Sequence, residues 1–263
     1  MNPTPLLSIQ RLNKSFMGLQ AVKDLSFGVD SGQIVGLIGP NGAGKTTVFN
    51  LISGLYGVDS GQILLNGREL TRLPPHKVSM HGISRTFQNI RLFRGLSVLD
   101  NILWALGTRA KYGIVESMLR CPKVRRQEDE TLQEALNLLY GSGLYDERFE
   151  KAGSLPYGKQ RRLELARALS TKPCLLLLDE PTAGMNPTET CELADYLKSV
   201  NNDGLTMLII EHDMPFVMEI CEKMVVLNHG AKIAEGSPEE IQNDETVIAA
   251  YLGRFSNASD RKP

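Results

Sequence analysis

The sequence predicts an α/β fold with a mostly parallel central sheet, an antiparallel β region and an inserted helical subdomain. Three observations lead to this class: short apolar runs typical of buried strands, helical stretches between them, and one long segment without strand signals. The apolar runs are Gln33–Ile38, Cys174–Leu178, Leu205–Ile210 and Met224–Leu227. Runs of this kind, separated by helices, indicate parallel strands covered on both faces.

The stretches between the runs carry signals for helix ends and turns. Asn186 is an N-cap candidate, with Pro187 in the first helical position and Glu189 in the first turn. The segment 237–240 has the Ser-x-x-Glu spacing of a capping box. Residues 228–230 read Asn-His-Gly, which predicts a turn between two short strands.

A length of 263 residues fits one large domain or two small ones. Because strand signals are missing between about residues 88 and 154, we predict a single domain with a core of about 6–87 and 156–253 and a helical subdomain of about 88–155. Within that subdomain, residues 109–126 include six basic residues and only one acidic residue, Glu116, which indicates either a solvated surface or a surface near anionic headgroups or a charged partner. The basic residues are Arg109, Lys111, Arg120, Lys123, Arg125 and Arg126.

Composition narrows the classes of function. The net charge of −1 lacks the basic excess of a general nucleic-acid binder, so no nucleic acid is expected. The longest apolar run, 247–252, is far shorter than the about 20 residues of a membrane-spanning helix, and the first residues do not resemble a secretory signal. Four widely spaced cysteines favour buried free thiols, and together these features predict a cytosolic protein.

A glycine-rich segment directly after the first apolar run carries the clearest chemistry. It matches the phosphate-binding loop Gly-x-x-x-x-Gly-Lys-[Ser/Thr], and a strand before it and a helix after it set it apart from a chance glycine-rich turn. Backbone N–H groups would wrap a phosphate, Lys45 would supply a positive charge, and Thr46 a hydroxyl for Mg²⁺. The candidate nucleotide-binding residues are Gly39, Pro40, Asn41, Gly42, Ala43, Gly44, Lys45, Thr46 and Thr47.

Two acids end the second apolar run. Asp179 is placed to orient Mg²⁺, and Glu180 is placed to accept a proton from an attacking water, with a structural helix-capping role as its alternative. His212 follows the third apolar run and could hydrogen-bond a γ-phosphate, although a lone histidine is more often structural.

Around these residues the sequence resembles the ATPase subunits of ATP-binding-cassette (ABC) transporters over nearly the whole chain. Residues 155–162, with Gly158 lying 21 residues before Asp179, stand where such proteins carry their Leu-Ser-Gly-Gly-Gln signature. The resemblance implies a P-loop ATPase in which this signature serves the ATP site of a second subunit.

Further positions match other motifs of the family. Gln88 is similar to the glutamine between core and helical insertion, His212 to the switch histidine, and 183–186 to the D-loop. Phe16 stands where the family stacks an aromatic ring on adenine, and its alternative is a core or edge-strand role. The resemblance thus implies ATP and Mg²⁺ as cofactors, with Thr46, Gln88 and Asp179 around the metal and Lys45, Glu180 and His212 in catalysis.

The segment 85–93 and the ending 250–253 are similar to one branch, the ATPases of high-affinity branched-chain amino acid importers. This resemblance implies a second, different ATPase subunit (a homodimer is the alternative), transmembrane permease subunits contacted by residues 92–106, and indirectly a periplasmic solute-binding protein. It places the chain in the cytoplasm, on the inner face of the cell membrane.

Two departures from the family pattern have consequences. Pro156-Tyr157 replaces the usual Ser-Gly, which removes one or two contacts to the partner's phosphate but suits a helix start. Asn186 replaces the usual Asp of the D-loop, which leaves the contacts across the dimer open.

Other functions fit less well. A small-molecule kinase would use the phosphate loop but neither the signature-like segment nor His212. A chromosome or repair ATPase needs a long coiled coil, and a translation-associated cassette protein usually carries two cassettes, whereas only one phosphate loop is present. The nearest alternatives are transporters for urea or amides, or for lipopolysaccharide export.

Overall fold

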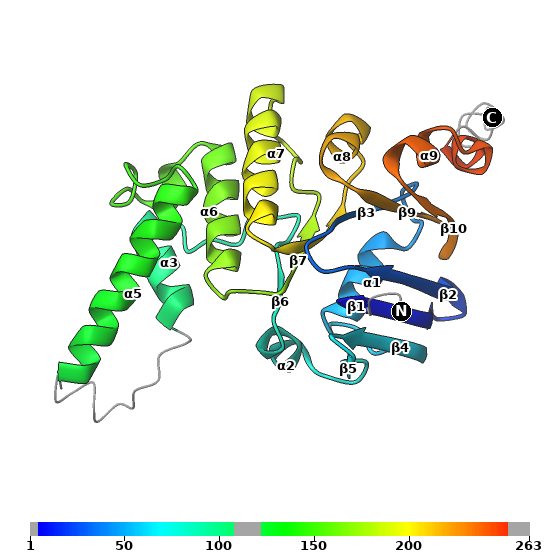
Figure 1. Cartoon of the computed structure of the whole chain (residues 1–263), viewed down its shortest axis with the longest axis horizontal. Helices are drawn as coiled ribbons and strands as arrows, with labels where there is room; N and C mark the ends of the chain where they lie inside the picture. The colour runs from blue at the N-terminus through cyan, green and yellow to red at the C-terminus, as the bar shows by residue number, and fades with distance from the viewer. Residues whose placement is uncertain (1–4, 108–121, 252–263) are drawn as a thin grey trace.

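The computed structural model describes residues 5–107 and 122–251, and its centre is a six-stranded sheet (Figure 1). The strand order is β10-β9-β3-β8-β7-β6. All neighbouring strands run parallel except β10, which pairs antiparallel with β9. The bounds are β3 Ile34–Ile38, β6 Ile83–Arg85, β7 Leu175–Asp179, β8 Thr206–Ile210, β9 Lys223–Asn228 and β10 Ala231–Gly236. The predicted parallel sheet is therefore present, with β6 at one edge.

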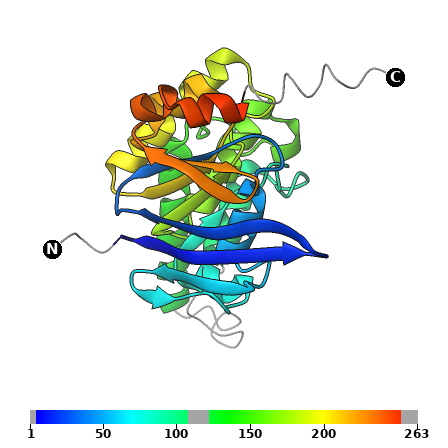
Figure 2. The same ribbon diagram turned by 90° about the vertical axis from the view of Figure 1, so that its right-hand side faces the viewer.

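A second, antiparallel sheet has the order β2-β1-β4-β5 (Figure 2). Its strands are β1 Leu7–Phe16, β2 Leu19–Val29, β4 Ser60–Leu65 and β5 Arg68–Glu69. Helix α1, Lys45–Ile52, contributes Val48 and Phe49 to a hydrophobic cluster that also holds residues of both sheets, such as Leu7 and Leu37. Burial of these side chains fixes the helix that follows the phosphate loop between the two sheets.

Other helices cover the rest of the parallel sheet. Helices α7 Pro187–Asn202, α8 Met214–Ile220 and α9 Pro238–Gln242 pack on its other face through a second hydrophobic cluster, and α2 spans Pro75–Met80. None of the helices within the described ranges combines the length and hydrophobicity that crossing a bilayer requires.

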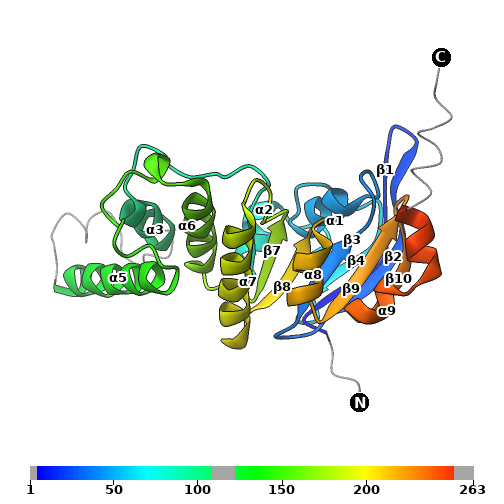
Figure 3. The same ribbon diagram turned by 90° about the horizontal axis from the view of Figure 1, so that it is seen from above.

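Helices α3, Val98–Gly107, and α5, Pro122–Gly141, lie at one end of the molecule (Figures 1 and 3). Helix α6, Tyr157–Leu169, lies between them and the sheet, and the short 3₁₀ helix η1, Ala152–Ser154, precedes it. A third hydrophobic cluster joins α3, α5 and α6 through residues such as Ile102, Leu139 and Leu163. The elements agree with a helical insertion, and its boundaries at 88 and 155 stay a prediction.

The start of the predicted helical subdomain differs from expectation, because residues 88–97 form no helix. The buried side chain of Asn101 satisfies this loop instead: it accepts a hydrogen bond from Phe93 N at 3.0 Å and donates one to Phe93 O at 3.1 Å. In the basic cluster, Arg125 and Arg126 are exposed, and Arg126 pairs with Glu130. Arg109, Lys111 and Arg120 lie outside the described residues, and the side chain of Lys123 is not described either.

The predicted helix and turn signals are confirmed. Asn186 and Ser237 each accept a hydrogen bond from the third residue of their helix, and each takes part in a complete capping box. The turn between β9 and β10 uses His229 and Gly230 at φ angles of 46° and 82°. A left-handed backbone at both positions matches the tight hairpin that the sequence predicted.

The prediction of buried thiols is only partly right. Cys221 is buried and Cys174 is half-buried, but Cys191 is exposed on α7. Helix α7 buries a single face, and Cys191 lies outside the stripe formed by Leu193, Ala194 and Leu197. The fourth cysteine, Cys121, lies outside the described residues.

Candidate functional site

The phosphate loop between β3 and α1 depends on glycine at two positions. Gly39 has a φ of 142°, and a Cβ atom there would lie 2.1 Å from the carbonyl oxygen of Leu227. Gly44 has a φ of 103°, and a Cβ atom there would lie 2.5 Å from the carbonyl oxygen of Ala21. Any side chain at either position would collide with the backbone, so the loop needs these glycines for both conformation and space.

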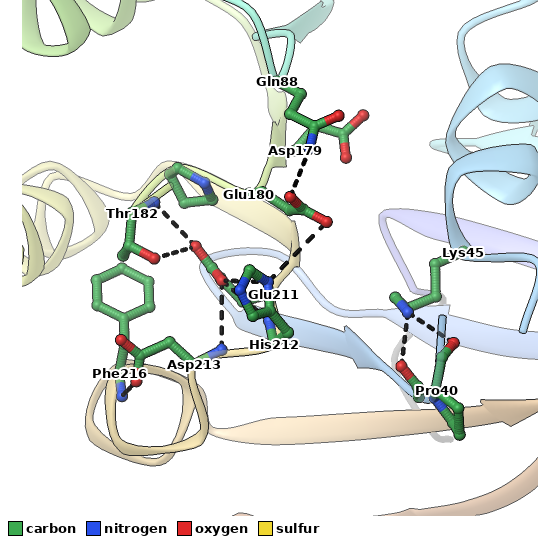
Figure 4. Close-up of polar contacts among 12 residues, drawn as sticks. Pro40, Lys45, Gln88, Asp179, Glu180, Thr182, Glu211, His212, Asp213 and Phe216 are labelled. Atoms are coloured by element: carbon green, nitrogen blue, oxygen red, sulfur yellow. Dashed lines mark hydrogen bonds and ion pairs between the residues drawn. The ribbon is translucent and has the colours of Figure 1, made fainter. Parts of the chain in front are cut away.

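The side chain of Lys45 is buried and turned back onto its own loop (Figure 4). Its Nζ donates to the carbonyl oxygens of Gly39 at 2.6 Å and Pro40 at 3.0 Å. Thr46, the next residue, is exposed at the start of α1. An anion entering the loop would therefore meet a positive charge already held in place, the N-terminus of a helix, and a hydroxyl group.

The structure brings Gln88, Glu180 and His212 together (Figure 4). Gln88 Nε2 donates to Glu180 Oε2 at 2.8 Å, and His212 Nδ1 lies 4.0 Å from Glu180 Oε1. Glu180 has a φ of 47°, in the left-handed region that a residue with a side chain rarely adopts. Strained backbone of this kind is common at functional sites, and here it follows directly after the last strand residue, Asp179.

Glu211 supports His212 and was not among the sequence-predicted residues. It is buried at the end of β8 and accepts hydrogen bonds from Thr182 N at 2.9 Å, Thr182 Oγ1 at 2.5 Å and His212 N at 2.9 Å. These bonds fix the backbone at His212 and tie it to the turn after Glu180. The position of Glu211 directly before His212 was the only sequence signal for its role. The sequence could not indicate its partner, because Thr182 lies 29 residues away.

Arg85 is a second residue that the sequence reasoning missed. It ends β6, and its Nη2 donates to Asp179 Oδ2 at 2.8 Å in an ion pair that is almost fully buried. A carboxylate has two oxygens and about four lone-pair positions, so the pair leaves Asp179 able to accept further bonds. Arg85 comes three residues before Gln88, so one short segment binds both acids at the end of β7.

A hard cation fits the oxygen donors available here. The Thr46 hydroxyl, the Gln88 amide and the Asp179 carboxylate are oxygen groups of the kind that Mg²⁺ takes, together with water and phosphate. Among residues 5–107 and 122–251, no group of three or more His, Cys, Asp or Glu could hold a metal by itself. Such a sparse donor set suits a metal held largely by a nucleotide and water rather than by a protein cage.

Arg161 is the third missed residue and the most buried. Its guanidinium is fully buried and donates to the backbone carbonyl oxygens of Phe87, Asp179, Glu180 and Pro181, as well as to the carboxylate of Glu164. Helix α6 is therefore attached to the Gln88 segment and to both acids. In the sequence it lies within the signature-like segment 155–162 and received no role of its own.

Residues 22–183 match the family described as ABC transporter. The chain belongs to the ABC transporter family. Residues 231–255 also match the family described as branched-chain amino acid ATP-binding cassette transporter.

Individual proteins similar to this ABC protein agree with this family assignment. The high-affinity branched-chain amino acid transport ATP-binding protein LivG of Salmonella typhimurium is 45% identical, over 95% of this chain and 98% of its own. The lipopolysaccharide export system ATP-binding protein LptB of Haemophilus influenzae is 36% identical, over 94% and 97%. A crystal structure of the ADP conformation of an ATP-binding cassette superposes with a TM-score of 0.83 at 29% identity, over 95% of this chain and 100% of the other.

The predicted fold class and membership of the cassette family are thereby confirmed, and the chain is an ATPase that binds ATP. The roles assigned to single residues stay predictions. They now have a geometry: Gln88, Asp179, Glu180 and His212 gather at the carboxyl ends of β6, β7 and β8, and Lys45 lies on the loop after β3.

The signature of this ABC cassette shows how its unusual residues are accommodated. Pro156 is the N-cap of α6, and a Cβ atom on Gly158 would lie 2.6 Å from Glu189 Oε1. The ring of Tyr157 lies where Gly184 has no side chain, 3.3 Å from the position of a Cβ atom there. Gly158 thus lies against α7, and its role toward another subunit stays a prediction.

Phe16, the predicted adenine contact, is partly exposed at the end of β1, with 39% of its surface accessible. Its ring meets Tyr56 edge-on at a centroid distance of 5.2 Å, and Lys14 Nζ lies 5.2 Å from its centroid. Phe16 is therefore not a core residue, and part of its surface is exposed.

Proposed function

We propose that this cassette is the ATP-hydrolysing subunit of an importer for branched-chain amino acids. The match of residues 231–255 and the 45% identity to the LivG protein support this solute. The lower identity of 36% to the lipopolysaccharide export protein LptB makes export the weaker candidate. Import of urea or amides is the remaining alternative.

One observation carries the catalytic assignment: Glu180 is held between Gln88 at 2.8 Å and His212 at 4.0 Å. Glu180 accepts the proton of the attacking water, and His212 donates to the γ-phosphate. Lys45 stabilises the negative charge of the phosphates, and the loop 39–47 holds them with its N–H groups. Phe16 stacks on the adenine.

Mg²⁺ is the proposed metal, and when bound it neutralises charge on the phosphate oxygens. Thr46, Gln88 and Asp179 would hold it, Asp179 through a water molecule. The hydrogen bond from Gln88 Nε2 to Glu180 restricts the directions in which the amide oxygen of Gln88 can point. Its engagement with the metal therefore depends on the position of the segment after β6.

A groove beside this segment is the proposed contact surface for a permease subunit. It is lined by residues of α2, β6, α3 and α6, such as Val78 and Trp104, and by Phe87 and Phe93 of the loop between β6 and α3. Trp104 and Phe93 are exposed, at 62% and 48%, which is unusual for large apolar side chains. The helical subdomain 88–155, and residues 92–106 within it, would thus face the membrane partner.

The cassette acts in a pair, most simply with a second, different ATPase subunit. Its signature helix, beginning near Gly158, caps the nucleotide of that partner, and a ligand shared by two subunits favours their closed state. Hydrolysis removes the shared contact and opens the pair. The assembly lies on the cytoplasmic face of the cell membrane and receives its solute indirectly from a periplasmic binding protein.

Reconstitution tests this function. The cassette should co-purify with its permease subunits, and branched-chain amino acids with the binding protein should stimulate phosphate release in liposomes. Urea and short amides are the matched controls. The assignment would be contradicted if urea stimulated phosphate release, or if no solute changed the rate of ATP hydrolysis.

A further inference from the structure

The side chain of Arg85 connects three parts of the molecule. It extends from the last residue of the edge strand β6 and lines the groove proposed for the permease. Its Nη2 donates to Asp179 Oδ2 at 2.8 Å, and its Nη1 donates to Asn50 Oδ1 at 2.7 Å and to Ser53 Oγ at 3.0 Å. One guanidinium thus joins the groove, the strand that ends in Asp179, and the helix after the phosphate loop.

The surroundings of the guanidinium hold it in one place. Its side chain is only 7% exposed, and its carbon Cζ lies 5.5 Å from the ring centroid of Phe49 and 5.2 Å from that of Phe87. Burial between rings strengthens the ion pair, because water cannot screen it well. A buried arginine with three side-chain acceptors on two elements cannot move without moving at least one of them.

We propose that Arg85 is a positioning residue with two effects. It sets the orientation of the Asp179 carboxylate for Mg²⁺, and it changes that orientation when a permease helix binds in the groove. The second half rests on the proposed function. Gln88 reaches Glu180 from the same segment, so Arg85 and Gln88 act on neighbouring acids: Arg85 on the metal carboxylate and Gln88 on the proton acceptor.

The chemistry of arginine is what the position requires. A lysine would keep the positive charge but has one nitrogen, so it could not span Asn50, Ser53 and Asp179 together. Arg85→Lys therefore separates orientation from charge. Loss of a group that orients a metal ligand typically weakens metal binding about 10–100-fold.

The test measures the Mg²⁺ dependence of nucleotide binding to the purified full chain, using a fluorescent ATP analogue. Arg85→Lys should raise the Mg²⁺ concentration at half-saturation by about tenfold or more. Asn50→Ala, which removes an anchor on α1 but keeps the arginine, should shift it in the same direction by less. Thermal melting shows that each variant is folded, and Asn50→Ala keeps the test valid should Arg85→Lys fail to fold.

Arg91→Lys is the matched control. The Arg91 guanidinium also lies on the ring of Phe87, at 3.9 Å, but its contacts do not include Asp179. Arg91→Lys should leave the Mg²⁺ half-saturation at the wild-type value. An equal shift in both variants, or a wild-type value in Arg85→Lys and in Asn50→Ala, would overturn the proposal.

The coupling half is tested in the complex with the permease. There Arg85→Lys should still assemble but lose most of the stimulation of ATPase activity by solute, even at saturating Mg²⁺. Full stimulation under those conditions would refute a role in coupling. If the wild-type chain binds no permease, the proposed function and the coupling half both fail, while the Mg²⁺ shift still decides what Arg85 does for Asp179.

Discussion

At the scale of single residues, Glu180 combines a strained backbone with two polar neighbours. Its left-handed φ of 47° costs of order 1–3 kcal/mol, so the fold must hold it there. Two of the holding bonds are on the backbone: Glu180 N donates to Ile210 O at 2.9 Å, and Glu180 O accepts from Arg161 at 2.8 Å. These bonds hold the backbone of Glu180 in place, and its side-chain carboxylate is not used in them and can act as a base.

Replacing Glu180 with glutamine should therefore separate binding from hydrolysis. The amide cannot accept the proton of water, so we expect turnover to fall by about 10²–10⁴-fold. ATP binding should persist, because the bonds to the Glu180 backbone do not involve its side chain. Phosphate release and equilibrium nucleotide binding measure the two effects. Near-normal hydrolysis in this variant would exclude Glu180 as the base.

Phe16 offers a second test at this scale. Stacking on a base is worth about 1–3 kcal/mol, so Phe16→Ala should weaken ATP binding by that amount and leave inorganic triphosphate binding unchanged. Leu19→Ala is the control, because Leu19 is exposed and pairs with Phe16 across the β1–β2 turn but has no ring. Equal losses for ATP and triphosphate would favour a packing role.

The cysteines should differ strongly in reactivity. Burial, with smaller contributions from Glu222 and Glu211, raises the pKa of Cys221 to about 12, so almost no thiolate exists at pH 8. Cys191 is exposed. Iodoacetamide should label Cys191 quickly in the folded protein and Cys221 only after denaturation, as followed by mass spectrometry of peptides. Similar rates for both in the folded protein would contradict the observed burial.

At the scale of elements, the start of α7 gives a physical reason for one departure from the family pattern. Asn186 Oδ1 accepts from Glu189 N at 3.0 Å, and Glu189 Oε2 accepts from Asn186 N at 3.0 Å. Asparagine and aspartate cap helices about equally well. The change from Asp to Asn in the D-loop therefore keeps the helix start intact.

The expected effect of removing this cap is measurable. Asn186→Ala should lower the free energy of unfolding by about 1 kcal/mol, whereas Asn186→Asp should change it by only a few tenths. Thr188→Ala, at an exposed position of the same turn, is the control. Urea denaturation measures all three. A loss in Asn186→Asp as large as in Asn186→Ala would show that the amide nitrogen matters and not the cap.

Local signals explain which elements the sequence could predict. Strands β3, β7, β8 and β9 and the caps at Asn186 and Ser237 depend on residues within a few positions of one another, and these were found. The short edge strand β6 was not. The missed residues depend on distant partners: Arg85 binds Asp179 across 94 positions, and Arg161 binds Phe87 across 74. The loop 88–97 was taken as helical because its apolar residues gave no sign that Asn101 would satisfy its backbone.

At the scale of the whole molecule, Arg161 links the helical end to the segments that carry Gln88 and Glu180. Its hydrogen bonds reach the segment before Gln88 and the turn that carries Glu180, while α6 packs against α3 and α5. The Glu164 carboxylate completes the link by accepting from Arg91 N at 3.1 Å. A movement of α6 must therefore displace the backbone of Glu180 or break these bonds.

Replacing Arg161 with methionine should test how much this link stabilises the fold. The change leaves Glu164 buried without its ion-pair partner and leaves buried carbonyl oxygens without donors, so we expect a loss of about 3–5 kcal/mol. Arg162→Gln is the control on the same helix: its partner Glu192 is 56% exposed, and such pairs contribute about 0–1 kcal/mol. The double variant Arg161→Met with Glu164→Leu should recover the part due to the unpaired carboxylate. Denaturant unfolding measures each value, and equal losses for Arg161→Met and Arg162→Gln would show that the buried network does not hold the two ends together.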